Sequence, residues 1–210
     1  MIPANHIEIA GIACERQDRL LFQNLSFQLG GGELARIHGL NGSGKSSLLK
    51  IITGLLHPLA GQVNWNHTAI TEQPGDYHQA LTWLGHKPAI KPELTVMENL
   101  KMLLGLRRQR FDRETTQQAL AVLSLEDYAS VQAGYLSAGQ QRRIALARLW
   151  LEPTALWVLD EPYTALDTKA VSLVNGAIEQ TLKRGGIVIM TSHQETKSLD
   201  VRAVNVYLET

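Results

Sequence analysis

The strongest chemical signal in this chain is a glycine-rich octapeptide, GLNGSGKS, at residues 39–46. It fits the pattern Gly-x4-Gly-Lys-Ser, in which glycines let backbone N–H groups turn inward around a phosphate. Lys45 is then expected to reach the β- and γ-phosphates, and the Ser46 hydroxyl to ligate Mg²⁺. The pattern predicts a nucleoside triphosphate site whose contacts come from Gly39, Leu40, Asn41, Gly42, Ser43, Gly44, Lys45, Ser46 and Ser47.

Two acids follow a short apolar run in LWVLDEP, residues 156–162. We expect Asp160 to hold Mg²⁺ through a water molecule, and Glu161 to take a proton from an attacking water. A strand that simply ends in solvated acids is the alternative, and it is the weaker one beside a phosphate loop. His193 follows a second apolar run, GIVIM, and is expected to contact the γ-phosphate and to steady the attacking water. Alone, a histidine in that position would more often be structural.

The apolar periodicity predicts an α/β core that is interrupted by a helical lobe. Thr95 followed by Glu98 is typical of a helix N-terminus with a capping box. Strands are expected at 34–38, 62–65, 81–84, 156–159, 187–191 and about 204–208, and helices at 46–56, 93–106, 113–123, 140–151 and 167–182.

The composition narrows the function classes. The chain has 20 Lys plus Arg against 20 Asp plus Glu, whereas a general nucleic-acid-binding protein would carry a basic excess. A single cysteine, Cys14, excludes an internal disulfide and fits a reducing compartment. The first residues do not read as a signal peptide. The apolar runs are far shorter than the roughly 20 residues that span a bilayer.

LSAGQ, residues 136–140, resembles the signature of ATP-binding-cassette (ABC) ATPases, usually LSGGQ, with Ala138 in place of the first glycine. The order of motifs also matches that family: phosphate loop, helical lobe, LSAGQQRR, LWVLDEP, TALD and then His193. The resemblance implies an α/β fold of the P-loop NTPase class and ABC type, with a mixed-sheet core and an inserted α-helical subdomain. It implies one ABC ATPase domain over 1–210, with its core at about 1–86 and 151–210 and the helical subdomain at about 87–150.

In ABC ATPases the signature contacts the γ-phosphate of ATP that is bound to a second, head-to-tail copy. The resemblance therefore implies a homodimer in which Ser137, Gly139 and Gln140 bind the partner's nucleotide. Asp167, in TALD, resembles the loop that crosses the same interface. A structural interpretation also stands, in which Ser137 simply caps the following helix with Gln140 behind it. Arg142, Arg143 and Arg148 are expected to be solvated or structural.

Longer strings narrow the resemblance to the ATP-binding subunits of cytochrome c maturation exporters. They are ACERQDRLLF (13–22), YHQALTWLGHKPAIK (77–91), LSAGQQRRIALARLWL (136–151) and LWVLDEPYTALD (156–167). The resemblance implies ATP and Mg²⁺ as cofactors, an integral membrane permease subunit with haem-handling partners, and a peripheral place on the cytoplasmic face of the bacterial inner membrane. It leaves the cargo open between haem export and release of a haem-loaded periplasmic chaperone. The histidines show no paired haem-ligand spacing.

Two positions depart from the wider family. His86 stands where most ABC ATPases carry a glutamine that links Mg²⁺ and the attacking water to the membrane subunit, and we expect His86 to take that coupling role. The alternative is that His86 only ends a strand. The aromatic residue that usually stacks on adenine is missing, and Arg16 lies near its place, since a guanidinium plane can stack on a base. Phe22 is a weaker candidate because LLF looks like strand core.

Two other function classes remain as alternatives. One is a soluble ABC ATPase that is not coupled to transport, although such proteins usually carry coiled-coil insertions or paired cassettes. The other is a regulatory module that binds ATP without useful hydrolysis, which the presence of Lys45, Asp160, Glu161 and His193 disfavours.

Overall fold

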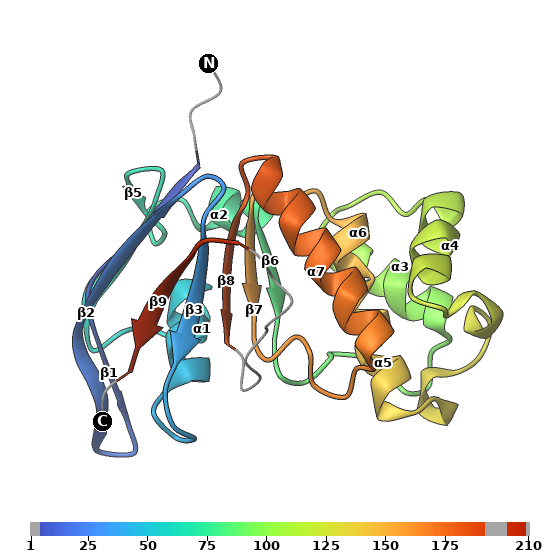
Figure 1. Cartoon of the computed structure of the whole chain (residues 1–210), viewed down its shortest axis with the longest axis horizontal. Coiled ribbons are helices and arrows are strands. Elements are labelled where there is room, and N and C mark those ends of the chain that lie inside the picture. Colours follow the sequence, from blue (N-terminus) through green and yellow to red (C-terminus); the bar gives the residue numbers. More distant parts are fainter. Residues whose placement is uncertain (1–4, 192–200, 209–210) are drawn as a thin grey trace. The chain divides into compact units, whose positions relative to one another are not determined.

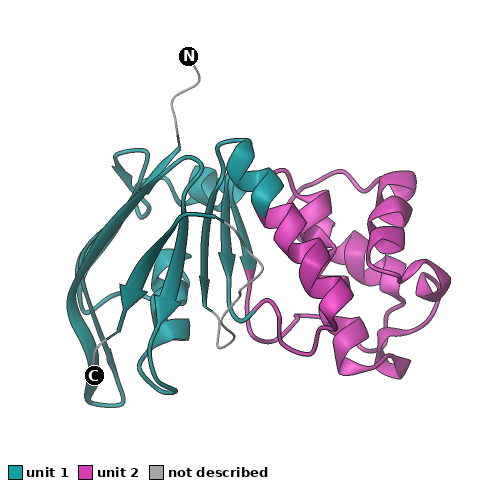
Figure 2. Ribbon diagram, viewed as in Figure 1, with its two compact units in different colours: residues 1–83, 154–161, 179–210 teal, residues 84–153, 162–178 magenta. Residues whose placement is uncertain are grey.

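The computed structural model describes residues 5–191 and 201–208 (Figure 1). The chain forms two compact units, coloured separately in Figure 2. The first unit comprises residues 1–83, 154–161 and 179–210, and the second comprises 84–153 and 162–178. The predicted helical subdomain, 87–150, falls within the second unit, which also takes in 162–178.

The first unit contains two sheets. The antiparallel sheet has the order β2 (Arg19–Gly30), β1 (His6–Arg16), β4 (Ala60–Trp65) and β5 (Thr68–Ala69). The second sheet has the order β6 (Leu81–Leu84), β7 (Leu156–Leu159), β8 (Ile187–Thr191), β3 (Leu34–His38) and β9 (Ala203–Tyr207). Its pairs β7–β8, β8–β3 and β3–β9 are parallel. Every residue of β7 and β8 is buried, as the continuous apolar runs of central parallel strands require.

Helix α1 (Lys45–Ile52) contacts both β1 and β8, so it joins the two sheets of the first unit. Its residues Leu48, Leu49, Ile51 and Ile52 are all fully or nearly fully buried in one apolar cluster with both sheets. Ser46 and Lys50 of the same helix are exposed, so α1 is amphipathic and buries its apolar face. Helix α2 (Pro74–Ala80) packs nearby, and the buried Tyr77 hydroxyl donates a 2.6 Å hydrogen bond to the carbonyl of Ile52.

The second unit is helical around its own apolar cluster. Its elements are α3 (Val96–Leu106), α4 (Arg113–Val122), η1 (Glu126–Tyr128), η2 (Ala133–Tyr135), α5 (Ala138–Leu146), α6 (Arg148–Leu151) and the first part of α7 (Thr168–Lys183). Thr95 caps α3 with the predicted capping box, in which Glu98 N–H donates to Thr95 Oγ1 and Thr95 N–H donates to Glu98 Oε2. The elements of the two units together match the α/β core and inserted helices predicted from the sequence.

Several boundaries differ from the predictions. Helix α1 ends at Ile52 rather than at residue 56, because the chain turns at Gly54 (φ 74°) and the N–H groups of Leu55 and Leu56 both bond back to the carbonyl of Lys50. The helix predicted at 140–151 begins at Ala138 and is divided at Ala147 into α5 and α6. The β1–β2 hairpin and α2 were not among the elements predicted from the sequence.

Candidate nucleotide site

The phosphate loop connects β3 to α1, as its position in the sequence predicted. Gly42 and Gly44 have φ values of 82° and 99°, in the left-handed region that favours glycine. A Cβ on Gly44 would also lie 2.9 Å from Cε1 of Phe22, which packs beneath the loop. Phe22 belongs to the buried core of the first unit, so its ring supports the loop, as the strand-core interpretation of LLF expected.

Lys45 is the first residue of α1, and its side chain is folded back along the loop. Its ammonium donates to the carbonyls of Gly39 at 2.7 Å and of Leu40 at 3.0 Å. The residue is 8% exposed, so the charge is held inside the loop curve. Both partners that the described residues offer this ammonium are neutral carbonyls. It can exchange them for phosphate oxygens, which form stronger, charge-assisted hydrogen bonds.

A cleft of about 890 Å³ opens beside this loop. Among the described residues, three cationic side chains and one carboxylate belong to its lining, which suits a polyanion. The lining residues are Arg16, Gln17, Arg19, Leu21, Asn41, Gly42, Gly44, Lys45, Ser46, Ser47 and Glu161. Six of the nine predicted loop residues belong to this lining, together with Arg16 and Glu161. Gly39, Leu40 and Ser43 are part of the same loop but not of the lining.

The tip of the β1–β2 hairpin brings two arginines to the cleft. Arg16 and Arg19 are directly paired across the hairpin, and the turn residues Gln17 and Asp18 have φ values of 51° and 58°. Like charges directly opposite each other in a sheet destabilise it, so a bound anion would relieve this repulsion. Of the four hairpin residues in the lining, Arg16 was predicted from the sequence, whereas Gln17, Arg19 and Leu21 were not. The dipeptide Gln-Asp gives little signal, because such two-residue turns favour Asn-Gly or Asp-Gly.

The two acids at the end of β7 share one buried hydroxyl. Thr191 Oγ1 donates a 2.8 Å hydrogen bond to Asp160 Oδ1 and accepts a 2.9 Å hydrogen bond from Glu161 N–H. Asp160 is 3% exposed, whereas Glu161 is partly exposed with φ at 49°. A non-glycine residue in this region is strained, and the Thr191 contact helps to hold it. The role of Thr191 was not predicted from the sequence. His193, predicted to lie beside Glu161, falls outside the described residues.

The donors at this site fit a magnesium ion. Ser46 contributes a hydroxyl to the lining of the cleft, and Asp160 contributes a carboxylate at the end of β7. Both are hard oxygen ligands, and Mg²⁺ usually takes only one or two such protein groups, with water and phosphate oxygens completing its coordination.

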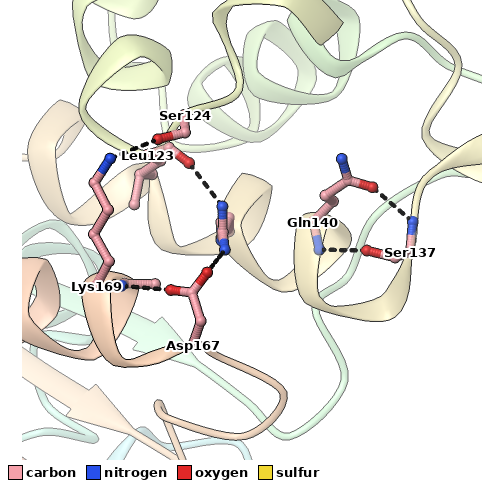
Figure 3. Close-up of polar contacts among 8 residues, drawn as sticks. Leu123, Ser124, Ser137, Gln140, Asp167 and Lys169 are labelled. Atoms are coloured by element: carbon pink, nitrogen blue, oxygen red, sulfur yellow. Dashed lines mark hydrogen bonds and ion pairs between the residues drawn. The ribbon is translucent and has the colours of Figure 1, made fainter.

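The predicted signature begins α5 in the second unit. Ser137 and Gln140 form a capping box, in which Gln140 N–H donates to Ser137 Oγ at 3.3 Å and Ser137 N–H donates to Gln140 Oε1 at 2.9 Å (Figure 3). The structural interpretation of this stretch is therefore confirmed. Because Ser137 is exposed and its oxygen acts as acceptor, the hydroxyl proton can still be donated to an external anion. Packing also explains the glycine at position 139, because a Cβ there would lie 2.6 Å from the carbonyl oxygen of Ala165.

Asp167 caps α7, with Oδ1 accepting a 2.8 Å hydrogen bond from Ala170 N–H (Figure 3). Its other oxygen pairs with Arg143 Nη2 at 2.5 Å. The Ala170 hydrogen bond, followed by the Arg143 charge, lowers the pKa of the Asp167 carboxyl. Arg142 donates to the carbonyls of Gly85 and His86 at 2.7 and 3.2 Å.

Arg148 binds the buried Glu152 through Nε at 2.6 Å. The three arginines after the signature, Arg142, Arg143 and Arg148, are therefore structural, as expected. His86 is exposed just after β6, and its role remains a prediction.

Comparison with known proteins places these features in a family. The ABC transporter family profile matches residues 22–164. The chain is 44% identical to the cytochrome c biogenesis ATP-binding export protein CcmA of Mannheimia succiniciproducens over 98% of this chain and 96% of that one. It is 47% identical to the protein of the same name from Yersinia pseudotuberculosis over 90% of this chain and 86% of that one.

Solved structures agree on the fold. An ABC transporter ATP-binding protein from Pyrococcus furiosus superposes with a TM-score of 0.82 at 28% identity, covering 97% of each chain. The fold alone is shared with a bacterial Atm1-family ABC exporter solved with ATP bound, at a TM-score of 0.85 and 17% identity, over 100% of this chain and 39% of that one. Across the described residues, no helix has the length and apolar character needed to cross a membrane.

The matched profile covers more than half of the chain, and the export proteins align with it almost end to end. The chain therefore belongs to the ABC transporter family and, within it, to the cytochrome c biogenesis ATP-binding export proteins.

Proposed function

We propose that this chain hydrolyses Mg²⁺-bound ATP as one of two identical subunits that drive a membrane complex in cytochrome c biogenesis. ATP binding and ATPase activity follow from its family membership. The observation that carries the site assignment is the cleft beside the phosphate loop, whose described lining includes Arg16, Arg19 and Lys45 and, as its acid, Glu161. This charge arrangement suits a triphosphate whose terminal group lies near a carboxylate base.

Each residue has a proposed task in the reaction. Lys45 leaves its two loop carbonyls and binds the β- and γ-phosphate oxygens, while the loop N–H groups surround the β-phosphate. Glu161 accepts the proton of the attacking water, and His193 orients that water. Ser46 and Asp160 would hold Mg²⁺, which supplies charge neutralisation on the phosphates. Arg16 stacks on the base.

The site is proposed to be completed by a second copy. Ser137, Gly139 and Gln140 of one subunit contact the γ-phosphate that is bound to the partner, and Asp167 crosses the same interface. Support comes from the exposed Ser137 at the N-terminus of α5, where backbone N–H groups and the helix dipole favour an anion. Phosphoryl transfer depends on positioning and charge stabilisation, so a half-site should turn over slowly.

A membrane permease with haem-handling partners is proposed to dock on the helical unit, which would place the chain at the cytoplasmic face of the inner membrane. His86 would link the membrane subunit to Mg²⁺ and the attacking water. The work done is either haem export or release of a haem-loaded periplasmic chaperone. Adding ATP to the purified membrane complex separates these two, because the first moves haem and the second dissociates the chaperone.

The Glu161→Gln variant tests the core of this proposal. It should bind ATP, form a stable dimer on a sizing column and nearly stop releasing phosphate, because the base is lost while the cations that bind the phosphates are kept. The Lys45→Ala variant is the control, which should fail to bind ATP. An active monomer without cooperativity would contradict the scheme.

Two further comparisons test the coupling. His86→Gln should keep ATPase activity that responds to the membrane subunit, whereas His86→Ala should lose that response. Full, coupled activity in His86→Ala would refute the role of His86. The alternative of an uncoupled soluble ABC ATPase predicts that no polytopic membrane protein co-purifies with the chain.

A further inference from the structure

Helix α5 is connected to the Asp167 turn at two separate points in the second unit. At its first turn, Gly139 lies so close to the carbonyl of Ala165 that no side chain fits between them. Near its other end, Arg143 pairs with Asp167. The signature and the TALD segment are therefore joined by both packing and charge.

Arg143 lies where three helices meet. Its Nη2 donates to the carboxylate of Asp167, which caps α7, and its Nη1 donates at 3.4 Å to the carbonyl of Leu123, which ends α4. A cation is favoured near the C-terminal end of a helix, and the capping carboxylate is favoured at an N-terminal end. The guanidinium thus connects two complementary helix ends while it is itself fixed on α5. Figure 3 shows the contacts of Asp167 and Leu123 beside the Ser137–Gln140 cap.

The turn that Arg143 holds has an unfavourable backbone. Ala165 has φ at 62°, a conformation that costs energy for any residue with a Cβ, and the turn is closed by a hydrogen bond from Leu166 N–H to the Tyr163 carbonyl. A strained segment keeps one conformation only when its surroundings determine it. Asp167 itself is 57% exposed, so its position depends on the Ala170 and Arg143 contacts rather than on burial.

We propose that Arg143 is a positioning residue that fixes Asp167 relative to Ser137, so that both segments reach the second nucleotide together. This inference rests on the proposed dimer. Arg143 touches no nucleotide in the scheme; it acts through Asp167. Replacing Arg143 should therefore weaken the ATP-bound dimer. The affinity of the isolated subunit's phosphate loop for ATP should stay unchanged.

The test measures ATP-driven dimerisation in the Glu161→Gln background. Arg143→Ala and the neutral, similarly long Arg143→Gln should each raise the dimer dissociation constant on the order of tenfold. Arg143→Lys should restore part of the loss because it keeps the charge next to Asp167. Lys169→Ala is the matched control: it removes a nearby cation that hydrogen-bonds Ser124 and whose charge acts on Asp167 less than Arg143 does. It should change dimerisation far less than Arg143→Gln.

A double-mutant cycle separates positioning from general destabilisation. Asp167→Asn should weaken the dimer, and adding Arg143→Gln to it should cause little further loss, because the two residues act as one pair. Independent, multiplicative effects would overturn the proposal, and so would tight dimerisation by Arg143→Gln. If Glu161→Gln alone fails to dimerise with ATP, the proposed function fails instead, which keeps the two failures distinguishable.

Discussion

The hydroxyl of Thr191 gives the sharpest prediction about the two acids, Asp160 and Glu161, that follow β7. Thr191→Val keeps the shape of the side chain but removes the hydrogen bond to the Asp160 carboxylate and the acceptor for Glu161 N–H. One bond involves a charged group and the other is neutral, and Thr191 is fully buried, so the expected loss in the free energy of unfolding is about 3 kcal/mol. For a chain of this size that corresponds to a fall in Tm of about 10 °C.

Activity should fall further than stability alone explains, because Glu161 loses the contact that helps to hold its strained backbone. We expect kcat for phosphate release to drop about tenfold with ATP affinity little changed. Thr191→Ser keeps the hydroxyl and should retain most activity. The matched control is Thr181→Val, since Thr181 is buried and its hydroxyl has no hydrogen-bond partner among the described residues. If Thr191→Val melts and turns over like Thr181→Val, the reasoning is wrong.

The remaining predictions concern the helical unit and α7. Gly139→Ala should lower the free energy of unfolding by about 2 kcal/mol, because its Cβ would meet the carbonyl of Ala165. Gly176→Ala, in open space within α7, should raise it by about 1 kcal/mol. Thermal melts of the two variants should therefore shift in opposite directions. Glu98 and Asp112 each accept a hydrogen bond from a backbone N–H at a helix N-terminus, from Thr95 and Thr115, and these bonds lower the pKa values of the two carboxyls. Because the pKa of each carboxyl is lower in the folded chain than in the unfolded chain, its hydrogen bond stabilises the fold above about pH 4. This contribution is lost as the pH falls through the folded pKa values. Denaturant melts across that range should show a shallower acid slope for Asp112→Asn than for the unmodified chain, and equal slopes would refute the linkage.

Many strands and helices could be predicted because their own residues show a clear local pattern. The strands at 81–84, 156–159 and 187–191 were predicted with the bounds that the structure has, since each is a short, mostly apolar run followed by a polar or turn-forming residue. The start of α3 was readable from Thr95 and Glu98, because the capping box is a local interaction between residues three positions apart.

The β1–β2 hairpin was missed because its pairing is irregular. The register shifts three times between Ile9 and Glu15, which breaks the alternation of apolar and polar residues that identifies a strand. Gly11, with φ at 61°, donates to the Ser26 hydroxyl inside this irregular stretch. Arg19 was missed for the same reason, since its place in the cleft depends on the hairpin register.

The residues of the phosphate loop were predictable because the loop is one contiguous motif. Thr191 and Ala165 were not, because each acts on a residue 26 or more positions away: Thr191 on the acids after β7, and Ala165 on the signature glycine. Such contacts depend on how strands and helices are placed in three dimensions, which local spacing does not encode. The assignments of Arg16, His86, His193 and the residues of the trans interface stay predictions.

In the proposed dimer, two polypeptides bind one triphosphate from opposite sides. A crystal or cryo-EM structure of the Glu161→Gln chain with Mg²⁺ and ATP tests it most directly. The account predicts that Ser137 and Gly139 of one copy contact the γ-phosphate held in the 39–46 loop of the other. A nucleotide-loaded assembly in which residues 136–140 lie far from every γ-phosphate would contradict it.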